Sequence, residues 1–381
     1  MHRFPKILVV SILSLLLALS FIAVACTPAS PANQEAPSPA ASTTPEGAVS
    51  LPPSPPGTIN TATGFISPDQ LGTTLVHEHF CFAYPGWFAD DTIAPYNREA
   101  ALQTGLKVCE TLKSIGVKTV IDPTPNDTGG RDPLLYKELS KRTGIQIICT
   151  TGLYTDAEGS PAYWKTRMAF MADLPKMMSD LFIKEITEGI GTTGVKAGAI
   201  KVGSSPKMTK YEEAVHEAAV IAQKATGVPI ITHTDGPSGG VEQAEFLIAA
   251  GADPKKIQIG HVNNSDDIKY HRAILAKGTK MAFDRIGLTI LYGVPDDITV
   301  QNIATLVKEG YANQIELSHD TVNFWIGRPI EVPPKAMPLF KDWRIDHISK
   351  DILPALKAQG VTDEQINIMM VENPRNLFLG K

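Results

Sequence analysis

Short apolar runs alternate with longer amphipathic segments along most of this 381-residue chain. Eight runs have the length and β-branched content of buried strands. They span Thr74–His79, Val117–Asp122, Ile145–Thr150, Ala197–Val202, Val228–His233, Ile257–His261, Met281–Asp284 and Ile315–Ser318. Helical periodicity occupies Arg98–Ile115, Pro133–Arg142, Lys210–Thr226, Val241–Ala250, Asp266–Lys277 and Thr299–Glu309. Eight such units in about 260 residues favour a (β/α)8 barrel over a doubly wound sheet. The first strand is not followed by GxGxxG, which argues against a dinucleotide-binding fold.

The N-terminal residues follow a different pattern. Arg3 and Lys6 precede an uncharged apolar stretch that ends in small residues just before Cys26. This order is typical of a secretory signal peptide. The small residues before the cysteine resemble the lipobox of bacterial lipoproteins, although Ala23 stands where that pattern prefers Leu. We therefore expect residues 1–26 to be a lipoprotein-type signal peptide with lipid attached to Cys26, and an uncleaved anchor helix is the alternative.

Composition divides the rest of the chain into a tether and one domain. Residues 27–57 contain nine prolines and no Lys or Arg, so they are predicted to be a disordered tether. Residues 58–381 have no second linker of this kind and form one predicted domain. The protein is thus expected outside the cytoplasm, held at a membrane only by its anchor. A net charge of −5 without a basic run argues against a nucleic-acid partner.

Polar residues gather where the predicted strands end, which is where a (β/α)8 barrel builds its active site. Four of the nine histidines occupy these ends, namely His77, His79, His233 and His261. Four others, His2, His216, His271 and His347, fall in the signal segment or in helices and are expected to be solvated. Cys81, Cys109 and Cys149 are expected to be small buried residues rather than nucleophiles.

The strand-end residues have the chemistry of metal ligands. His77 and His79 share one strand face by alternation, and Glu78 takes the other. Lys201 lies in an apolar strand, where burial lowers a lysine's pKa and lets the neutral amine react with carbon dioxide to form a carbamate. By the same alternation Ser318 and Asp320 share a face, so Asp320 is a predicted ligand and His319 faces away. Together with His233 and His261, these residues predict two divalent ions, most simply zinc, with manganese, cobalt or iron also admitted.

With these residues in place, the chain resembles the phosphotriesterase family of the amidohydrolase superfamily over residues 60–381. The matching stretches are GTTLVHEH, VKTVIDP, KAGAIKV, VPIITHT, IGH, SHD and ENP. The resemblance implies one ion held by His77, His79, carboxylated Lys201 and Asp320, and a second held by Lys201, His233 and His261. It also implies a bridging hydroxide that attacks a small-molecule substrate, a proton role for Asp320, and a homodimer.

Two branches of that family compete. Lactonase-like members carry a tyrosine after strand three and an arginine after strand seven, matched here by Tyr154 and Arg285. The resemblance implies that Tyr154 positions a lactone, such as an acyl-homoserine lactone, and that Arg285 orders the gate. Alternatively, Tyr154 only packs a loop and Arg285 only pairs with a carboxylate such as Asp284. We therefore expect a lactonase with promiscuous phosphotriesterase activity, and a dedicated phosphotriesterase is the first alternative.

The chain departs from the family at one position. Asn264 replaces the aspartate of the family's Gly-His-x-Gly-Asp stretch, and an amide cannot accept a proton at working pH. We expect Asn264→Asp to raise turnover on substrates with poor leaving groups, unless Asp266 folds inward and substitutes. This departure keeps open a third hypothesis, a membrane-tethered binding lipoprotein that has lost catalysis.

Overall fold

The computed structural model describes residues 54–170, 173–328 and 330–381. All of them fall within one compact unit, Gly47–Lys381. The predicted signal peptide with Cys26, and the predicted tether as far as residue 53, lie outside the described residues. Within the described ranges, no helix combines the length and the apolar character needed to cross a bilayer.

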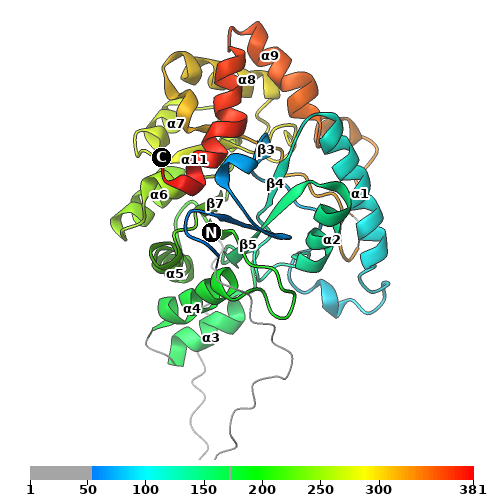
Figure 1. The fold of residues 1–381 in the computed structure, drawn as a ribbon, viewed down its shortest axis with the longest axis vertical. Coiled ribbons are helices and arrows are strands. Elements are labelled where there is room, and N and C mark those ends of the chain that lie inside the picture. The colour runs from blue at the N-terminus through cyan, green and yellow to red at the C-terminus, as the bar shows by residue number, and fades with distance from the viewer. Residues whose placement is uncertain (1–53, 171–172, 329) are drawn as a thin grey trace, which may run out of the picture. The chain divides into compact units, whose positions relative to one another are not determined.

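Eight parallel strands form the central sheet and follow one another around it in chain order (Figure 1). They are β3 (Thr74–Leu75), β4 (Thr119–Asp122), β5 (Gln146–Leu153), β6 (Ala199–Ser204), β7 (Ile230–Thr234), β8 (Ile257–Ile259), β9 (Lys280–Phe283) and β10 (Ile315–Leu317). Each predicted strand overlaps one of them. The predicted (β/α)8 barrel is confirmed.

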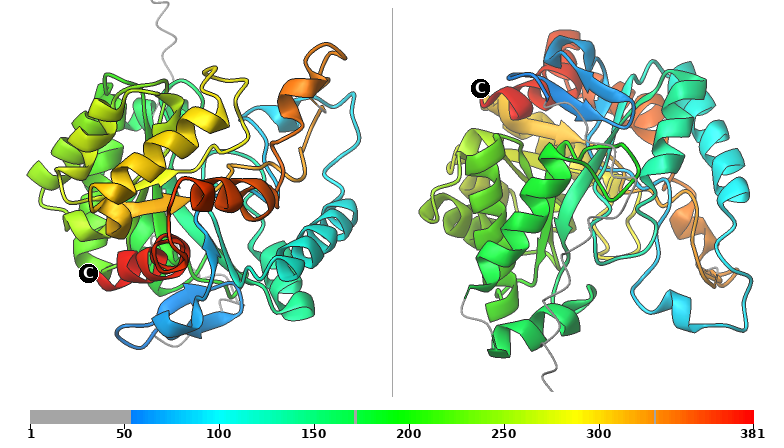
Figure 2. Two further views of the ribbon diagram at one scale, coloured as in Figure 1. Left: turned by 90° about the horizontal axis from the view of Figure 1, so that it is seen from above. Right: turned by 60° about the horizontal axis from the view of Figure 1, so that its bottom comes forward.

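The first and last strands are joined beyond their ends. The His79 amide donates to the carbonyl of Thr321 at 2.8 Å, and the Phe82 amide donates to that of Phe324 at 3.1 Å. The segments that follow β3 and β10, cyan and orange in Figure 2, therefore lie side by side. This pairing explains why β3 is shorter than predicted, because the chain after Leu75 turns to pair with the segment after β10.

Helices cover the outside of the sheet (Figure 1). The six predicted ones form α1 (Arg98–Ser114), α2 (Pro133–Thr143), α5 (Lys210–Thr226), α6 (Gly240–Ala249), α7 (Ile268–Leu275) and α8 (Asp296–Lys308). Local signals set their ends: α5 begins at a capping box made by Thr209 and Glu212, and it stops at Gly227 in the left-handed conformation.

Among the described residues, five α-helices were not predicted. They are α3 (Pro161–Phe170), α4 (Leu174–Thr187), α9 (Leu353–Ala358), α10 (Asp363–Asn367) and α11 (Asn373–Leu379). Helix α4 carried a readable signal, because Leu174, Met178, Phe182 and Ile186 are buried at four-residue spacing.

The barrel interior is filled by apolar side chains and is closed at the end where the strands begin. Alternate strand residues, among them Val76, Ile121 and Ile231, form a small apolar cluster inside the sheet. An unpredicted hairpin of β1 (Ile59–Thr61) and β2 (Gly64–Ile66) adds Ile59 to this cluster and bonds to the carbonyls of Ile147 and Ala197 where β5 and β6 begin. The candidate functional residues lie at the opposite end of the barrel, where the strands finish.

Candidate metal centre

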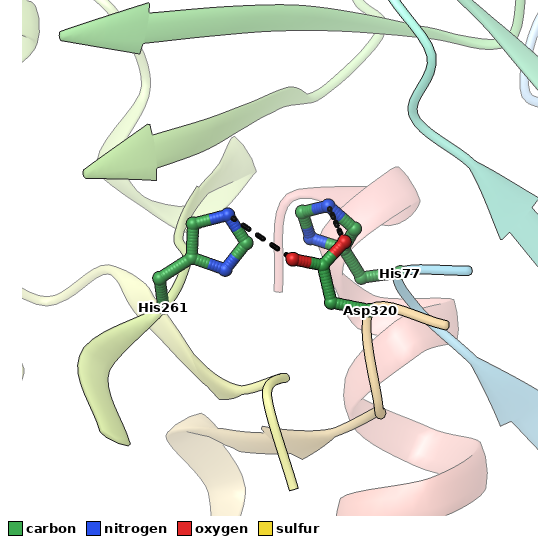
Figure 3. A group of neighbouring side chains, drawn as sticks. All are labelled: His77, His261 and Asp320. Atoms are coloured by element: carbon green, nitrogen blue, oxygen red, sulfur yellow. Dashed lines mark ion pairs between the residues drawn. The ribbon is translucent and has the colours of Figure 1, made fainter. Parts of the chain in front are cut away.

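The structure brings all six predicted metal ligands to one place. His77 and His79 follow β3, Lys201 lies in β6, His233 lies in β7, and His261 and Asp320 follow β8 and β10. All six are buried and line one small cavity. In Figure 3 the rings of His77 and His261 and the carboxylate of Asp320 point toward one another from separate elements.

The distances between ligand atoms are short. Asp320 Oδ1 lies 3.2 Å from His79 Nε2 and 3.4 Å from His77 Nε2. His77 Nε2 is also 3.2 Å from Lys201 Nζ. On the other side of the cavity, His233 Nδ1 and His261 Nε2 lie 2.8 Å apart. The donors therefore form two neighbouring groups: the first donor group consists of His77, His79, Lys201 and Asp320, and the second consists of His233 and His261. The two groups approach each other where Asp320 Oδ2 lies 3.8 Å from His261 Nε2.

One carboxylate orients two of the imidazoles. Asp284, at the end of β9, lies within the barrel on the face shared with Ala282. His77 Nδ1 lies 2.7 Å from Asp284 Oδ2, and His261 Nδ1 lies 3.0 Å from Asp284 Oδ1. Each ring therefore donates its Nδ1–H to Asp284, which leaves the Nε2 lone pair directed at the cavity.

The other two imidazoles are oriented separately. His79 Nδ1 is 2.7 Å from the Thr124 hydroxyl, which itself donates to Asp122 at 2.6 Å. His233 Nε2 is 2.8 Å from Asp235 Oδ1, so its Nδ1 carries the free lone pair. In His77, His233 and His261 this pattern leaves the cavity-facing nitrogen available as a metal ligand, since metal binding requires it without a proton. In His79, burial lowers the pKa, but hydrogen bonds to Asp122 and Asp320 outweigh burial and raise the pKa to about 9, so an ion would have to displace a proton from this ring.

The donors fit divalent ions in both spacing and chemistry. Two ligands at 2.0–2.1 Å from a tetrahedral zinc ion lie about 3.3 Å apart, close to the Asp320–His77 and Asp320–His79 separations. Burial lowers the pKa of His233 to about 4 and outweighs Asp235, and burial also holds the pKa of His261 well below its usual range. Neutral imidazoles with a carboxylate are a donor set for zinc and related ions.

Lys201 is placed for the predicted modification. Its side chain is 1% exposed, and burial lowers its pKa to about 8 against the pull of Asp320. A larger fraction of its amine is therefore neutral near pH 7 than in an exposed lysine. Its Nζ lies beside His77 Nε2, at the side of the first donor group.

Backbone strain is concentrated at two of these residues. Among the described non-glycine residues, only His261 and Asp320 have positive φ, at 58° and 55°. Such conformations persist where surrounding contacts impose them, and they are common at functional sites. Gly152 matters for a related reason: a Cβ there would lie 1.8 Å from the carbonyl oxygen of Lys201, so β5 could not approach β6 with a larger residue.

Tyr154 and Arg285 both border the centre. The Tyr154 hydroxyl lies 3.0 Å from His233 Nδ1, and burial raises its pKa well above the usual range. Arg285 Nε donates to Asp320 Oδ2 at 2.9 Å, so its carboxylate partner is the predicted ligand rather than Asp284. Arg285 also reaches Asn264 Oδ1 at 3.4 Å.

The proton route expected through position 264 is not supported by this arrangement. Arg285 stands between Asp320 and Asn264, and a guanidinium does not give up or take on a proton in proteins. Asn264 Nδ2 instead donates to the carbonyl of Gly236 at 3.2 Å. The suggested substitute, Asp266, is exposed and does not fold inward.

Three further residues belong to the site but were not assigned to it from sequence. The sequence could have indicated Asp284, because this residue ends a predicted strand on the interior face, but it was considered only as a partner for Arg285. Thr124 had none. Glu78 was placed only on the opposite face from the ligands, where it bonds to Ser318 and His319. Ser318 was therefore assigned to the wrong side, because the left-handed backbone at Asp320 breaks the alternation.

The expectation of solvated helical histidines was wrong. His216, His271 and His347 are 0%, 0% and 5% exposed, and each has a hydrogen-bond partner. His2 lies outside the described residues. The three domain cysteines are buried as expected, and burial raises the pKa of Cys109 to about 11.

A cavity of about 410 Å³ opens above the donors. His79, Asp320, Tyr154 and Arg285 lie at its base. Apolar side chains form most of its wall, including Phe82, Tyr84, Trp325, Trp343, Leu288 and Ile290. A second cavity of about 430 Å³ lies beside Ile59 and Phe378, and none of the predicted ligands lines it.

A family model of the phosphotriesterase family matches residues 57–378. The chain belongs to this family. An aryldialkylphosphatase of Saccharolobus solfataricus is 35% identical over 318 residues, which cover 82% of this chain and 96% of that protein. A solved organophosphorus hydrolase of Deinococcus radiodurans is 44% identical with a TM-score of 0.82, covering 87% and 99% of the two chains. Another solved structure, with the same identity and TM-score and covering 84% and 99%, concerns organophosphate hydrolysis engineered from a weak promiscuous lactonase template.

Membership of the phosphotriesterase family makes this chain a metal-dependent hydrolase of ester or phosphoester bonds. The family uses a binuclear metal centre, and the structure has candidate groups of ligands for one. The convergent donor set leaves the non-catalytic alternative without support.

Proposed function

We propose that this phosphotriesterase-family hydrolase opens lactones and cleaves related neutral esters, with promiscuous phosphotriesterase activity. The observation that carries the proposal is the position of Tyr154. Its hydroxyl lies 3.0 Å from His233 Nδ1, at the base of an apolar cavity that opens on the donors. A protonated phenol at this point can donate a hydrogen bond to an ester oxygen as the bond breaks.

Two divalent ions, zinc in our proposal, would be held by the six ligands in the two groups implied by the family. When bound, such ions polarise an ester or phosphoryl oxygen and activate water. Asp320 would keep one ion in place through Oδ1 while Arg285 holds Oδ2. The surrounding imidazoles and Arg285 outweigh burial and hold the pKa of Asp320 well below its usual range, so it remains a carboxylate.

The wall of the cavity favours neutral substituents on the substrate. Arg285, the one Arg or Lys residue among those that line it, is already paired with Asp320. An anionic substituent held against the apolar side chains, away from the ions, would therefore have no free cation to pair with, which is costly. A lactone with an apolar acyl group should be hydrolysed better than the same lactone with a carboxylate at the end of that group.

A direct test compares kcat/KM for a panel of lactones and for nitrophenyl phosphotriesters, using the metal-loaded full chain. We expect the lactones to give the higher values, whereas the reverse order would favour the alternative, a dedicated phosphotriesterase. Tyr154→Phe should lower kcat/KM for lactones by about tenfold, the worth of one hydrogen bond, and change nitrophenyl phosphotriester hydrolysis little. The exposed Tyr163→Phe is the control. Equal effects of Tyr154→Phe on both substrate classes would contradict the role proposed for Tyr154.

We also propose export and lipid attachment at Cys26, supported by the basic, apolar and small-residue order of residues 1–26. A homodimer is proposed from the family resemblance alone. Sedimentation of the metal-loaded protein tests the dimer.

A further inference from the structure

The carboxylate of Glu78 collects an unusual number of hydrogen bonds. It is 1% exposed and lies between the two predicted ligands His77 and His79. Its Oε1 accepts from Ser318 Oγ at 2.8 Å, from the His319 amide at 2.9 Å and from His319 Nδ1 at 2.7 Å. Its Oε2 accepts from the Thr321 amide at 2.9 Å and from Thr321 Oγ1 at 2.5 Å.

These donors come from both sides of one residue. Ser318 and His319 precede Asp320, and Thr321 follows it, so one carboxylate oxygen holds each flank. Asp320 itself has φ 55°, a conformation that non-glycine residues seldom adopt. Because both flanks are tied to one rigid carboxylate, the backbone between them cannot relax to an extended conformation.

Through Ser318, the Glu78 carboxylate also links Asp320 to His77, another ligand of the first donor group. Ser318 Oγ accepts from the His77 amide at 3.0 Å, and the Asp320 amide donates to the His77 carbonyl at 3.0 Å. We call Glu78 and these hydrogen bonds the Glu78 clamp. The clamp fixes the position of Asp320 relative to His77, and the ligand atoms Asp320 Oδ1 and His77 Nε2 lie 3.4 Å apart.

We propose that Glu78 is a positioning residue: by bonding both flanks of Asp320, it holds that carboxylate where it completes the ion site of His77 and His79. The inference rests on the proposed metal-binding role of Asp320. Glu78 touches no substrate and no ligand atom, and it acts through the backbone at 318–321.

The Glu78→Gln variant tests the Glu78 clamp, because glutamine has nearly the same shape as glutamate. Its carbonyl can serve one flank, but its NH2 then faces N–H or O–H donors on the other. Glu212 offers a matched control. It is 0% exposed and accepts four hydrogen bonds, from Asp156, Ser205 and Thr209, none of which flanks a predicted ligand.

The experiment measures metal stoichiometry and affinity, by titration with a competing chelator, for wild type, Glu78→Gln and Glu212→Gln. We expect Glu78→Gln to weaken one of the two ions by about 10–100-fold and leave the other near its wild-type affinity. Glu212→Gln should leave both unchanged. If Glu78→Gln does not fold, Thr321→Val removes only one bond to the clamp and should weaken the same ion less.

Three results would overturn the inference. The first is a folded Glu78→Gln with wild-type affinity at both sites, and the second is an unchanged ion affinity in Thr321→Val when Glu78→Gln does not fold. The third is an equal loss in Glu212→Gln, which would show a general effect of stability. A wild-type protein that binds no ion would instead refute the proposed binuclear centre, and with it the inference.

Discussion

Glu316 is a buried acid inside the barrel whose charge should cost the protein stability. It lies on β10 beside Ala282 in the parallel register, and it is 0% exposed. Its Oε2 accepts one hydrogen bond, from Gln258 Nε2 at 2.5 Å, and its Oε1 has no partner. Lys280, whose charge acts on Glu316, donates its hydrogen bond to the carbonyl of Asn313 instead. Burial therefore dominates and raises the pKa of Glu316 from 4.5 to about 7, against the opposing effect of Gln258.

The sign and size of the effect follow from this pKa. Because the pKa is higher in the folded state than in the unfolded state, the stability associated with the neutral carboxyl is present below pH 4.5 and lost as the pH rises through 7. The gap between the two pKa values corresponds to about 3 kcal/mol in the free energy of unfolding. Glu316→Gln keeps the shape and stays neutral, so it should be more stable than wild type by about 3 kcal/mol at pH 8, or about 5 °C in Tm.

The assay is urea unfolding of wild type and Glu316→Gln at a series of pH values from 5 to 8.5. The metal centre is common to both proteins, so its own pH dependence cancels in the difference. Gln258→Leu removes the donor to Glu316, which raises the pKa of Glu316 further and should extend the loss of stability to higher pH. A difference between wild type and Glu316→Gln that stays constant across the pH range would refute the reasoning.

The other predictions concern the metal centre and the N-terminus. Metal analysis should find two divalent ions per chain, and Lys201→Ala should lose nearly all activity, with partial rescue by short-chain carboxylates if Lys201 is carboxylated; one ion or none in the wild type would contradict the binuclear site. Asn264→Asp should not raise turnover on substrates with poor leaving groups, because the new charge would pair with Arg285 and draw it from Asp320; a rise would restore the proton route through position 264. Cys26→Ser should leave an unprocessed precursor, and a mature unlipidated protein would indicate cleavage by an ordinary signal peptidase.

Local pattern was sufficient for the architecture and for selecting the candidate ligands that the structure brings together. The period of apolar positions distinguishes strands from helices, and the alternation of eight strands with helical segments leaves few folds to choose from. Because active sites of such barrels lie where strands end, His77, Lys201 and His233 could be selected before any contact was known. The misjudged histidines show the limit of this reasoning: His216 and His271 lie in amphipathic helices, and period alone did not tell which face of each helix packs inward.

Only the tertiary structure decided which side chains meet. Glu78 and His319 are 241 positions apart, and Asp284 joins His77 across 207 positions, so no local pattern relates them. The choice of Asp320 over Asp284 as the partner of Arg285 depends on side-chain direction at the rim, and so does the isolation of Asn264 from Asp320. The left-handed backbone at Asp320 likewise exists because distant donors and acceptors hold it there. Hydrogen bonds act over about 3 Å, and only folding brings residues so far apart in the chain within that range.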